Sequence, residues 1–260
     1  MSQATDRESL FSVEDTVAVI TGGGSGLGAQ MALALDVSTV QFERGKCANR
    51  VKANGARAVY ILGRRADSLQ KTVDAAVNHK IVPIVADVTS QESLAAAAAE
   101  VRAAEGVVDV LIANSGIFGP THYGLFPVSE TSSISDIQSN LWNIPMGAWT
   151  QTMHVNVTGT FYTIVAFLDL LDAANHRSAT SFPRPKSQVI VISSISGFIR
   201  LPGGSFSYGP SKAAATHMGK QLATSFAPYK IRFNTIAPGV VSQCQGSNIF
   251  VFMLIVIPVS

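Results

Sequence analysis

The run Thr16-Val-Ala-Val-Ile-Thr-Gly-Gly-Gly-Ser-Gly-Leu-Gly28 decides the fold of this chain. Residues 16–20 are mostly apolar and β-branched, which is typical of a buried strand. Glycines fill the turn that follows, and residues 29–35 read as a helix. Such a unit can cradle a dinucleotide pyrophosphate, because glycine lets the backbone approach the phosphates and the helix amino end offers free N–H groups. The alternative is a glycine-rich connection that holds no ligand.

Further apolar runs along the chain predict more strands of the same sheet. They cover residues 56–62, 81–86, 107–113, 188–192 and 231–237. Helical stretches separate most of them, notably the alanine-rich segment 91–105. This alternation predicts an α/β fold with a doubly wound, mostly parallel sheet, Rossmann-like, with six clear strands. Polar or glycine-rich residues follow the strands at their carboxyl ends, where ligands bind in such sheets.

A tyrosine and a lysine lie four residues apart in Tyr208-Gly-Pro-Ser-Lys212, at the start of a predicted helix. This spacing puts both side chains on one helical face. A tyrosine has an ordinary pKa of about 10, and a nearby positive charge favours its phenolate. A tyrosine tuned in this way can exchange a proton with a carbonyl oxygen. By itself the pair is more often a surface coincidence.

Together with the glycine-rich turn, the remaining motifs resemble the short-chain dehydrogenase/reductase family. The family's motifs occur here in order as Thr21-Gly22-x-x-x-Gly26-x-Gly28, Asn114-Ser-Gly116, Asn156, Ser194, Tyr208-x-x-x-Lys212 and Pro238-Gly239. The resemblance extends from about Val13 to Val240, with one interruption. The chain has Asn-Ser-Gly where the family usually has Asn-Ala-Gly, a small change that should be tolerated.

The resemblance implies a set of catalytic roles. Tyr208 would be the general acid/base, and Lys212 would lower the Tyr208 pKa and hold the nicotinamide ribose. Ser194 would hydrogen-bond the substrate oxygen, with Ser193 as the alternative. Asn156 would anchor a water in a proton relay, although a polar contact within a helix is the alternative for this residue.

The resemblance also implies a cofactor site and a reaction. Asp87 would bind the adenine amino group, and Asn114 would hold the central strand beside the cofactor. The full set of implied cofactor-binding residues is Thr21, Gly22, Ser25, Gly26, Leu27, Gly28, Arg64, Arg65, Asp87, Val88, Asn114, Gly116, Tyr208, Lys212, Pro238 and Gly239. The expected reaction is hydride transfer between a nicotinamide cofactor and a carbonyl or secondary alcohol.

The end of the second predicted strand indicates which nicotinamide cofactor is bound. An acidic side chain there would accept hydrogen bonds from the adenosine ribose and favour NAD. The chain has Gly63-Arg64-Arg65 instead. Two guanidinium groups suit a 2′-phosphate, which favours NADP(H) over NAD(H). The alternative is that one of the arginines is merely solvated.

Composition limits the remaining function classes. A length of 260 residues suggests a single domain, 1–260, and 47% hydrophobic with 14% charged residues fits a largely buried sheet. A net charge of +2 gives no sign of a nucleic-acid surface, and the five histidines have no metal-ligand spacing. Residues 1–14 are polar and lack a signal-peptide core, so a cytoplasmic location is expected.

Two segments depart from the family pattern. Residues 36–52 form an atypical insertion, and residues 241–260 form an atypical tail that ends in an apolar run, 249–259. Both begin near a Val-Ser pair, which the common intron donor GTA-AGT can encode. We hypothesise that both are translated introns, which sequencing of the transcript across the junctions would test. A genuine insertion and a divergent tail are the alternative.

The atypical tail bears on the structure. It suggests that the substrate lid and a seventh strand are missing. The run 249–259 is too short to span a membrane as a helix, and it either mimics a strand or promotes aggregation. The long segment 118–147 either lines the active-site entrance or is a surface loop packed by its own aromatic side chains.

Three functions remain open from the sequence. The first is a working NADPH-dependent carbonyl reductase with a small-molecule substrate and no nucleic-acid or membrane partner. The second is a cofactor-binding but catalytically impaired truncated product. The third is a non-enzymatic regulator that senses NADP(H). Helices near residues 146–171 and 209–227 resemble those that form dimers and tetramers in the family, so a homo-oligomer is expected.

Overall fold

A seven-stranded sheet forms the centre of the computed structural model, which describes residues 13–37, 55–122, 133–177, 185–200 and 204–239, and 254–258 as a strand. The strand order is β3-β2-β1-β4-β5-β6-β7. The strands are β1 (Val17–Thr21), β2 (Ala58–Gly63), β3 (Ile81–Val85), β4 (Val110–Ala113), β5 (Gln188–Ile192), β6 (Arg232–Pro238) and β7 (Leu254–Pro258). β1 to β6 are parallel, as the alternating sequence pattern predicts.

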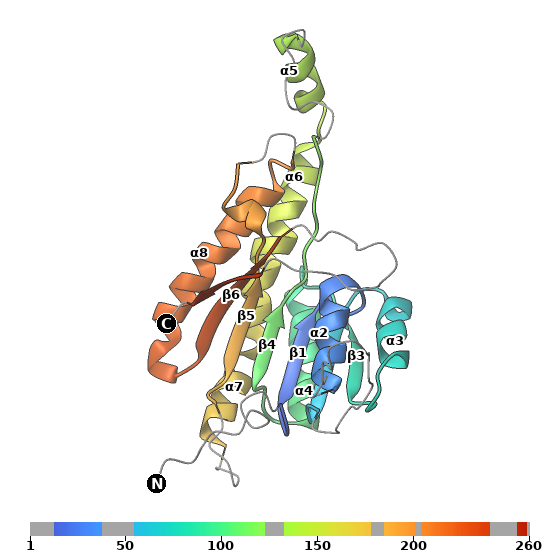
Figure 1. Cartoon of the computed structure of the whole chain (residues 1–260), viewed down its shortest axis with the longest axis vertical. Coiled ribbons are helices and arrows are strands. Elements are labelled where there is room, and N and C mark those ends of the chain that lie inside the picture. Colours follow the sequence, from blue (N-terminus) through green and yellow to red (C-terminus); the bar gives the residue numbers. More distant parts are fainter. Residues whose placement is uncertain are drawn as a thin grey trace, which may run out of the picture.

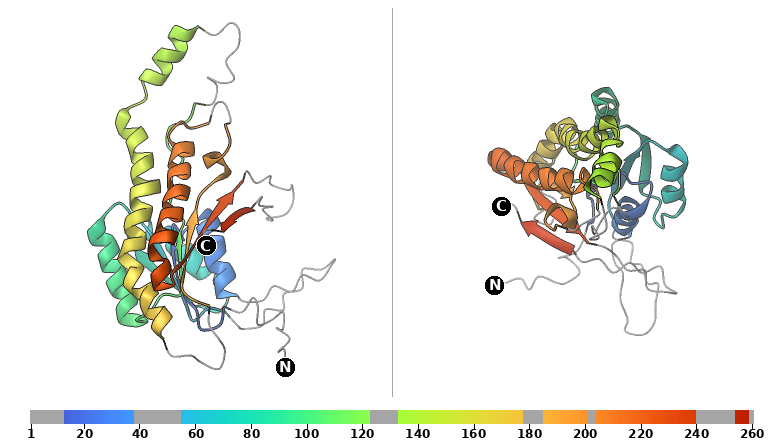
Figure 2. Two further views of the ribbon diagram at one scale, coloured as in Figure 1. Left: turned by 90° about the vertical axis from the view of Figure 1, so that its left-hand side faces the viewer. Right: turned by 90° about the horizontal axis from the view of Figure 1, so that it is seen from above.

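Helices cover both faces of the sheet (Figures 1 and 2). On one face lie α2 (Gly26–Asp36) and α3 (Ala66–Asp74). On the other lie α4 (Gln91–Ala104), α7 (Thr160–His176) and α8 (Tyr208–Phe226). The doubly wound arrangement confirms the predicted fold class. It places the loops that follow β1, β2 and β4 together at one end of the sheet, where the candidate site lies.

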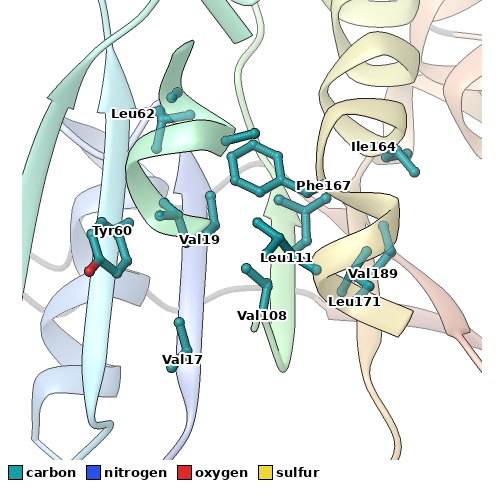
Figure 3. Close-up of a cluster of buried hydrophobic side chains, with 14 of the residues drawn as sticks. Val17, Val19, Tyr60, Leu62, Val108, Leu111, Ile164, Phe167, Leu171 and Val189 are labelled. Atoms are coloured by element: carbon teal, nitrogen blue, oxygen red, sulfur yellow. The ribbon is translucent and has the colours of Figure 1, made fainter. Parts of the chain in front are cut away.

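The main apolar core lies between the sheet and the second helical layer (Figure 3). Phe167 and Leu171 of α7 are fully buried there, against Val19 and Leu111 of the central strands. The β-branched and leucine side chains of the strands pack on both faces, which is why these strands read as continuous apolar runs. A rigid central sheet therefore supports the loops at its carboxyl end.

The six predicted strands are all present, but the expectation that a seventh strand is missing is wrong, because the atypical tail supplies β7. This strand pairs antiparallel with β6, with Thr235 opposite Ile257. The result confirms the interpretation of the apolar run as a strand mimic. Pairing satisfies backbone groups of β6 that would otherwise form an open sheet edge. The predicted loss of the substrate lid concerns residues 240–253, which lie outside the described residues.

Segment 118–147 contains a helix that the sequence analysis did not predict. Helix α5 (Ile134–Trp142) stands out beyond the carboxyl ends of the strands (Figure 1). Trp142 is 85% exposed, so this ring does not pack within a compact surface loop. Tyr123 and Phe126, two further aromatic residues of this segment, lie outside the described residues.

A long continuous helix follows α5. It runs from α6 (Met146–Met153) through a π-helical turn, His154–Gly159, into α7. Within the described residues this helix alone, Met146–His176, has the length and hydropathy to cross a bilayer. Ile164 and Phe167 are fully buried in the main core, so here it serves as a core helix.

The two ends of the atypical insertion lie against each other. Ala56 N donates to Leu35 O at 2.9 Å, and a Cβ at Gly55 would collide with Asp36 O. Asp36 is fully buried and ends α2. Its carboxylate accepts hydrogen bonds from the backbone N–H groups of Val77, Asn78 and Lys80. The predicted boundary at residue 36 is therefore wrong, since Asp36 belongs to the folded body.

Deleting residues 38–54, so that Val37 is joined to Gly55, is expected to leave the fold intact. The ends are already adjacent, and shortening a connection lowers the entropy lost on folding, by about 0.6 kcal/mol for each halving. We expect an unchanged or slightly raised free energy of unfolding, measured by thermal and urea denaturation followed by circular dichroism. An insoluble or unfolded product would show that the segment contributes essential contacts.

Candidate active site

A pocket of about 350 Å³ lies at the carboxyl ends of β1, β2 and β4. Its walls come from the glycine-rich turn, the β2–α3 connection and the segments after β3 and β4. The lining residues are Gly22, Gly24, Ser25, Leu27, Gly63, Arg64, Arg65, Ser68, Leu69, Ala86, Asp87, Val88, Asn114, Ser115, Gly116, Ile117 and Val155. This is the position at which α/β sheets bind dinucleotides.

The glycine-rich turn fits too tightly for side chains at several positions, Gly22 and Gly28 among them. Gly22 has φ +69°, and a Cβ on it would lie 2.9 Å from Asn114 Nδ2. A Cβ on Gly28 would lie 2.6 Å from the same atom and closer still to Gly22 O. Asn114 Nδ2 donates to Thr21 O at 2.9 Å, and Thr21 Oγ1 accepts from Asn114 N at 3.0 Å. These contacts join the ends of β1 and β4 beneath the pocket.

The amino end of α2 faces this pocket. Ser25, the residue before the helix, lines the pocket, and its side chain makes no capping hydrogen bond to the helix. The first N–H groups of a helix have no partner within the helix, and the helix dipole favours negative charge at that end. The turn and the helix end are therefore suited to the pyrophosphate of a dinucleotide.

Two arginines line the far side of the same pocket. Arg64 and Arg65 are exposed and follow β2, and Ser68 of α3 lines the pocket beside them. Arg65 is the residue immediately before α3. Two guanidinium groups and a serine hydroxyl make this part of the pocket positively charged and rich in hydrogen-bond donors.

Asp87 is held in place by its own loop. Its Oδ1 accepts hydrogen bonds from Thr89 N at 2.9 Å and Thr89 Oγ1 at 2.7 Å. Partial burial works against ionisation, but these hydrogen bonds and the charge of Arg64 lower the Asp87 pKa overall. Asp87 therefore presents a carboxylate to the pocket at neutral pH.

Tyr208 and Ser194 are brought together, as the resemblance implied. Their side chains are hydrogen-bonded. Burial raises the pKa of the Tyr208 phenol, and the Ser194 hydroxyl only partly offsets this effect. The Tyr208 ring also stacks on Phe118, with ring centroids 4.6 Å apart and planes inclined by 28°. The phenol is consequently protonated at neutral pH and positioned as a proton donor.

The prediction that Lys212 lowers the Tyr208 pKa is wrong for this structure. Lys212 Nζ lies 5.7 Å from the centroid of the tyrosine ring and donates to Ile192 O at 2.8 Å. The ammonium is thus held by a backbone carbonyl rather than by the phenol oxygen. Desolvation lowers the Lys212 pKa to about 8, because the side chain is almost completely buried.

Asn156 connects three segments around the lysine. It lies in the π-helical turn, is buried, and accepts from Ile117 N at 2.8 Å through Oδ1. Its Nδ2 donates to Ile117 O and to Ser211 Oγ, each at 2.9 Å. A Cβ on Gly116 would lie 3.2 Å from both Asn156 Oδ1 and Lys212 Nζ. These contacts show more than a polar contact within one helix, and π-helical turns occur frequently at functional sites.

Ser193, the alternative to Ser194, has a structural position. Its Oγ donates to Lys212 O at 2.9 Å and lies 2.7 Å from Thr216 Oγ1. Both partners belong to α8, so Ser193 fastens the helix to the end of β5. The geometry therefore favours Ser194 as the serine beside the substrate.

Most of the predicted cofactor residues converge, but several do not line the pocket. Thr21, Gly26, Gly28, Pro238 and Gly239 lie at or near the carboxyl ends of β1 and β6 without contributing to its walls. Tyr208 and Lys212 are also outside the walls, although Lys212 Nζ adjoins Gly116, which lines it. Within the described residues, no group of three or more metal-ligating side chains occurs.

Sequence reasoning missed some residues of the pocket. They are Gly24, Gly63, Ser68, Leu69, Ala86, Ser115, Ile117 and Val155. Ser115 and Ile117 are sequence neighbours of the predicted Asn114 and Gly116, and this adjacency could have identified them. Val155 likewise precedes the predicted Asn156, and it lies in the π-helical turn.

Comparison with known protein families gives an independent result. The family model described as short chain dehydrogenase matches residues 45–248. This match includes part of both segments that the sequence analysis treated as atypical. The short-chain dehydrogenase/reductase PhomF of Diaporthe leptostromiformis is 39% identical over 232 residues, which cover 89% of this chain and 71% of PhomF. VdtF of Byssochlamys spectabilis, also a short-chain dehydrogenase/reductase, is 35% identical over 95% of this chain and 80% of VdtF.

Solved structures agree with this result. A short-chain type dehydrogenase/reductase from Mycobacterium marinum superposes with a TM-score of 0.68 at 26% identity, over 88% of this chain and 76% of that one. The RhlG/NADP active-site complex from Pseudomonas aeruginosa gives a TM-score of 0.66 at 26% identity, over 88% and 74%.

Proposed function

The chain belongs to the short-chain dehydrogenase/reductase family and is an NAD(P)-dependent oxidoreductase, and from this premise we propose that it reduces a ketone at the expense of NADPH. The observation that carries the proposal is the hydrogen-bonded pair of Ser194 and Tyr208 beside Lys212, next to a pocket that fits a dinucleotide. A bound nicotinamide supplies the hydride, and the protein supplies position and electrostatics.

Four residues of this chain have separate roles in the proposed proton transfer. Tyr208 donates its phenol proton to the substrate oxygen as negative charge develops there. Ser194 donates a second hydrogen bond to the same oxygen, which stabilises that charge. Lys212, whose Nζ donates to Ile192 O and lies 5.7 Å from the centroid of the Tyr208 ring, is proposed to hold the nicotinamide ribose. Asn156 holds the Gly116–Ile117 segment against Lys212 and is proposed to support the return of a proton to Tyr208.

NADP(H) is favoured over NAD(H) because of the charge beside β2. Arg64 and Arg65 line the pocket and would hold a 2′-phosphate on the adenosine ribose, with Ser68 as a further donor. The turn around Gly22 would hold the pyrophosphate, and Asp87 the adenine amino group.

Replacing Arg64 or Arg65 by alanine is expected to raise the KM for NADPH by roughly ten- to a hundredfold, because each change removes charge-assisted hydrogen bonds. The KM for NADH should stay nearly constant. Initial rates with both cofactors measure this effect, with Arg102→Ala on α4 as the control for loss of a surface charge. Equal losses with NADPH and NADH would contradict the proposed phosphate contact.

An assay of the purified chain tests the function as a whole. NADPH absorbance is followed in time with a panel of ketones, and cofactor affinity is measured separately. Oxidation of NADPH that depends on ketone supports a reductase. Tight NADPH binding without turnover would instead indicate an impaired enzyme or a sensor. The cytoplasmic location and the homo-dimer or tetramer stay predictions.

A further inference from the structure

Exposed apolar side chains gather around the catalytic tyrosine. Phe118, Phe198, Ile199 and Phe206 have 40%, 51%, 41% and 49% of their surface exposed. Among the described residues, the exposed phenylalanines are Phe118, Phe198 and Phe206. Single exposed apolar residues need no explanation, but a group of them beside an active site commonly marks the binding of an apolar ligand.

Contacts with α8 bring these residues to one place. Phe118 stacks on Tyr208, and Phe206 lies two residues before it. Phe198 and Ile199 follow the short 3-10 helix Ile195–Gly197, which packs on the start of α8. We call these four residues, Phe118, Phe198, Ile199 and Phe206, the aromatic rim. Phe118 contacts the Tyr208 ring from the segment after β4, and the other three residues lie on the segment between β5 and α8.

Phe118 is fixed in its position by the residues after it. Gly119 packs so closely on Thr152 and Ser207 that a Cβ on it would overlap their side-chain oxygens. His122 is buried, its Nδ1 lies 2.9 Å from Gly204 O, and its ring lies 4.6 Å from that of Phe206. The segment that carries Phe118 is thus tied to the start of α8, and a ligand need not order it on binding.

We propose, on the basis of the reductase function above, that the substrate is a flat aromatic ketone and that Phe118 determines this specificity. A planar ring placed against Phe118 brings its carbonyl oxygen towards the neighbouring Tyr208 and Ser194 hydroxyls. Offset stacking favours such rings over aliphatic chains of equal hydrophobicity. The remainder of the aromatic rim covers the apolar surface of the ring system.

Three ketones test this specificity in the full-length enzyme with NADPH: acetylnaphthalene, methyl nonyl ketone and L-tagatose. We expect kcat/KM to be highest for acetylnaphthalene. Phe118→Ala should lower that value by roughly five- to tenfold, mainly through KM, and Phe118→Leu should give a similar loss because it restores bulk but not stacking. Methyl nonyl ketone should change by less than about twofold in both variants, because its chain does not stack. Tyr229→Ala, which removes an exposed ring at the far end of α8, serves as the control.

A binding measurement separates this inference from the reductase function. Calorimetric titration of acetylnaphthalene into Tyr208→Phe in the presence of NADP⁺ should show binding, and adding Phe118→Ala should weaken it several-fold. Binding without turnover in the wild type would overturn the reductase function but support the aromatic site. Turnover with equal preference for all three ketones, or equal losses for all in Phe118→Ala, would overturn the aromatic specificity alone.

Discussion

Replacing Tyr208 with phenylalanine is expected to lower kcat for ketone reduction by about 10²–10⁴-fold, the usual contribution of a positioned general acid. The change removes the phenol proton and the hydrogen bond to Ser194 but keeps the ring that stacks on Phe118. The fold and the affinity for NADPH should therefore be retained. Stopped-flow measurement of NADPH oxidation, together with a thermal denaturation curve, distinguishes loss of chemistry from loss of structure.

The pH dependence of the wild type provides a second readout for Tyr208. Burial raises the Tyr208 pKa, so the donor form should persist through neutral pH and be lost only as the pH rises through that raised value. Reduction should accordingly be fastest on the acidic side and decline in alkaline buffer. Tyr229→Phe is the matched control for Tyr208→Phe, since it also removes a phenol hydroxyl, but an exposed one remote from Ser194. Unchanged turnover in Tyr208→Phe would remove the proposed mechanism.

Replacing Gly28 with alanine is expected to weaken NADPH binding at least about tenfold and to destabilise the fold by about 1–3 kcal/mol, the usual cost of overpacking. The added methyl group would overlap Gly22 O and lie 2.6 Å from Asn114 Nδ2. Neither group can move without disturbing the turn that joins β1 to α2. Fluorescence titration with NADPH and urea denaturation measure the two effects.

Gly147→Ala is the matched control for this change. A Cβ on Gly147 meets no atom within 4 Å, and the residue lies inside helix α6. Alanine there should be neutral or stabilising by up to about 1 kcal/mol, since it is the better helix former. A Gly28→Ala protein that binds NADPH as the wild type does would show that the turn is not the phosphate cradle.

The sequence predicted the parallel strands well, because each is a short apolar run buried on both faces. It also identified Ser194, Tyr208, Lys212 and Asn156 by the order of their motifs, and the structure places these four at the start of α8 and around it. The direction of β7 could not be predicted, since pairing with β6 depends on where the chain returns in space.

The direction of the Tyr208 pKa shift shows a second limit of sequence reasoning. A four-residue spacing fixes the helical face on which Lys212 lies, but not the direction of a long, flexible side chain. In the structure the ammonium reaches Ile192 O, which lies on a strand far away in the sequence. Desolvation of the phenol then dominates, and its extent depends on packing that no local pattern encodes.

The closure between Leu35 and Ala56 has a consequence for the production of this protein in a cell. Because the two ends meet, the folded body places little constraint on the length of chain that separates them. Chaperones and proteases act on exposed apolar surface and on the unfolded population. A longer or shorter connection at this point need not change either of them. Under the hypothesis that this insertion is a translated intron, transcripts with and without the extra codons would both be expected to give a folded product, whereas a genuine insertion would be tolerated for the same reason.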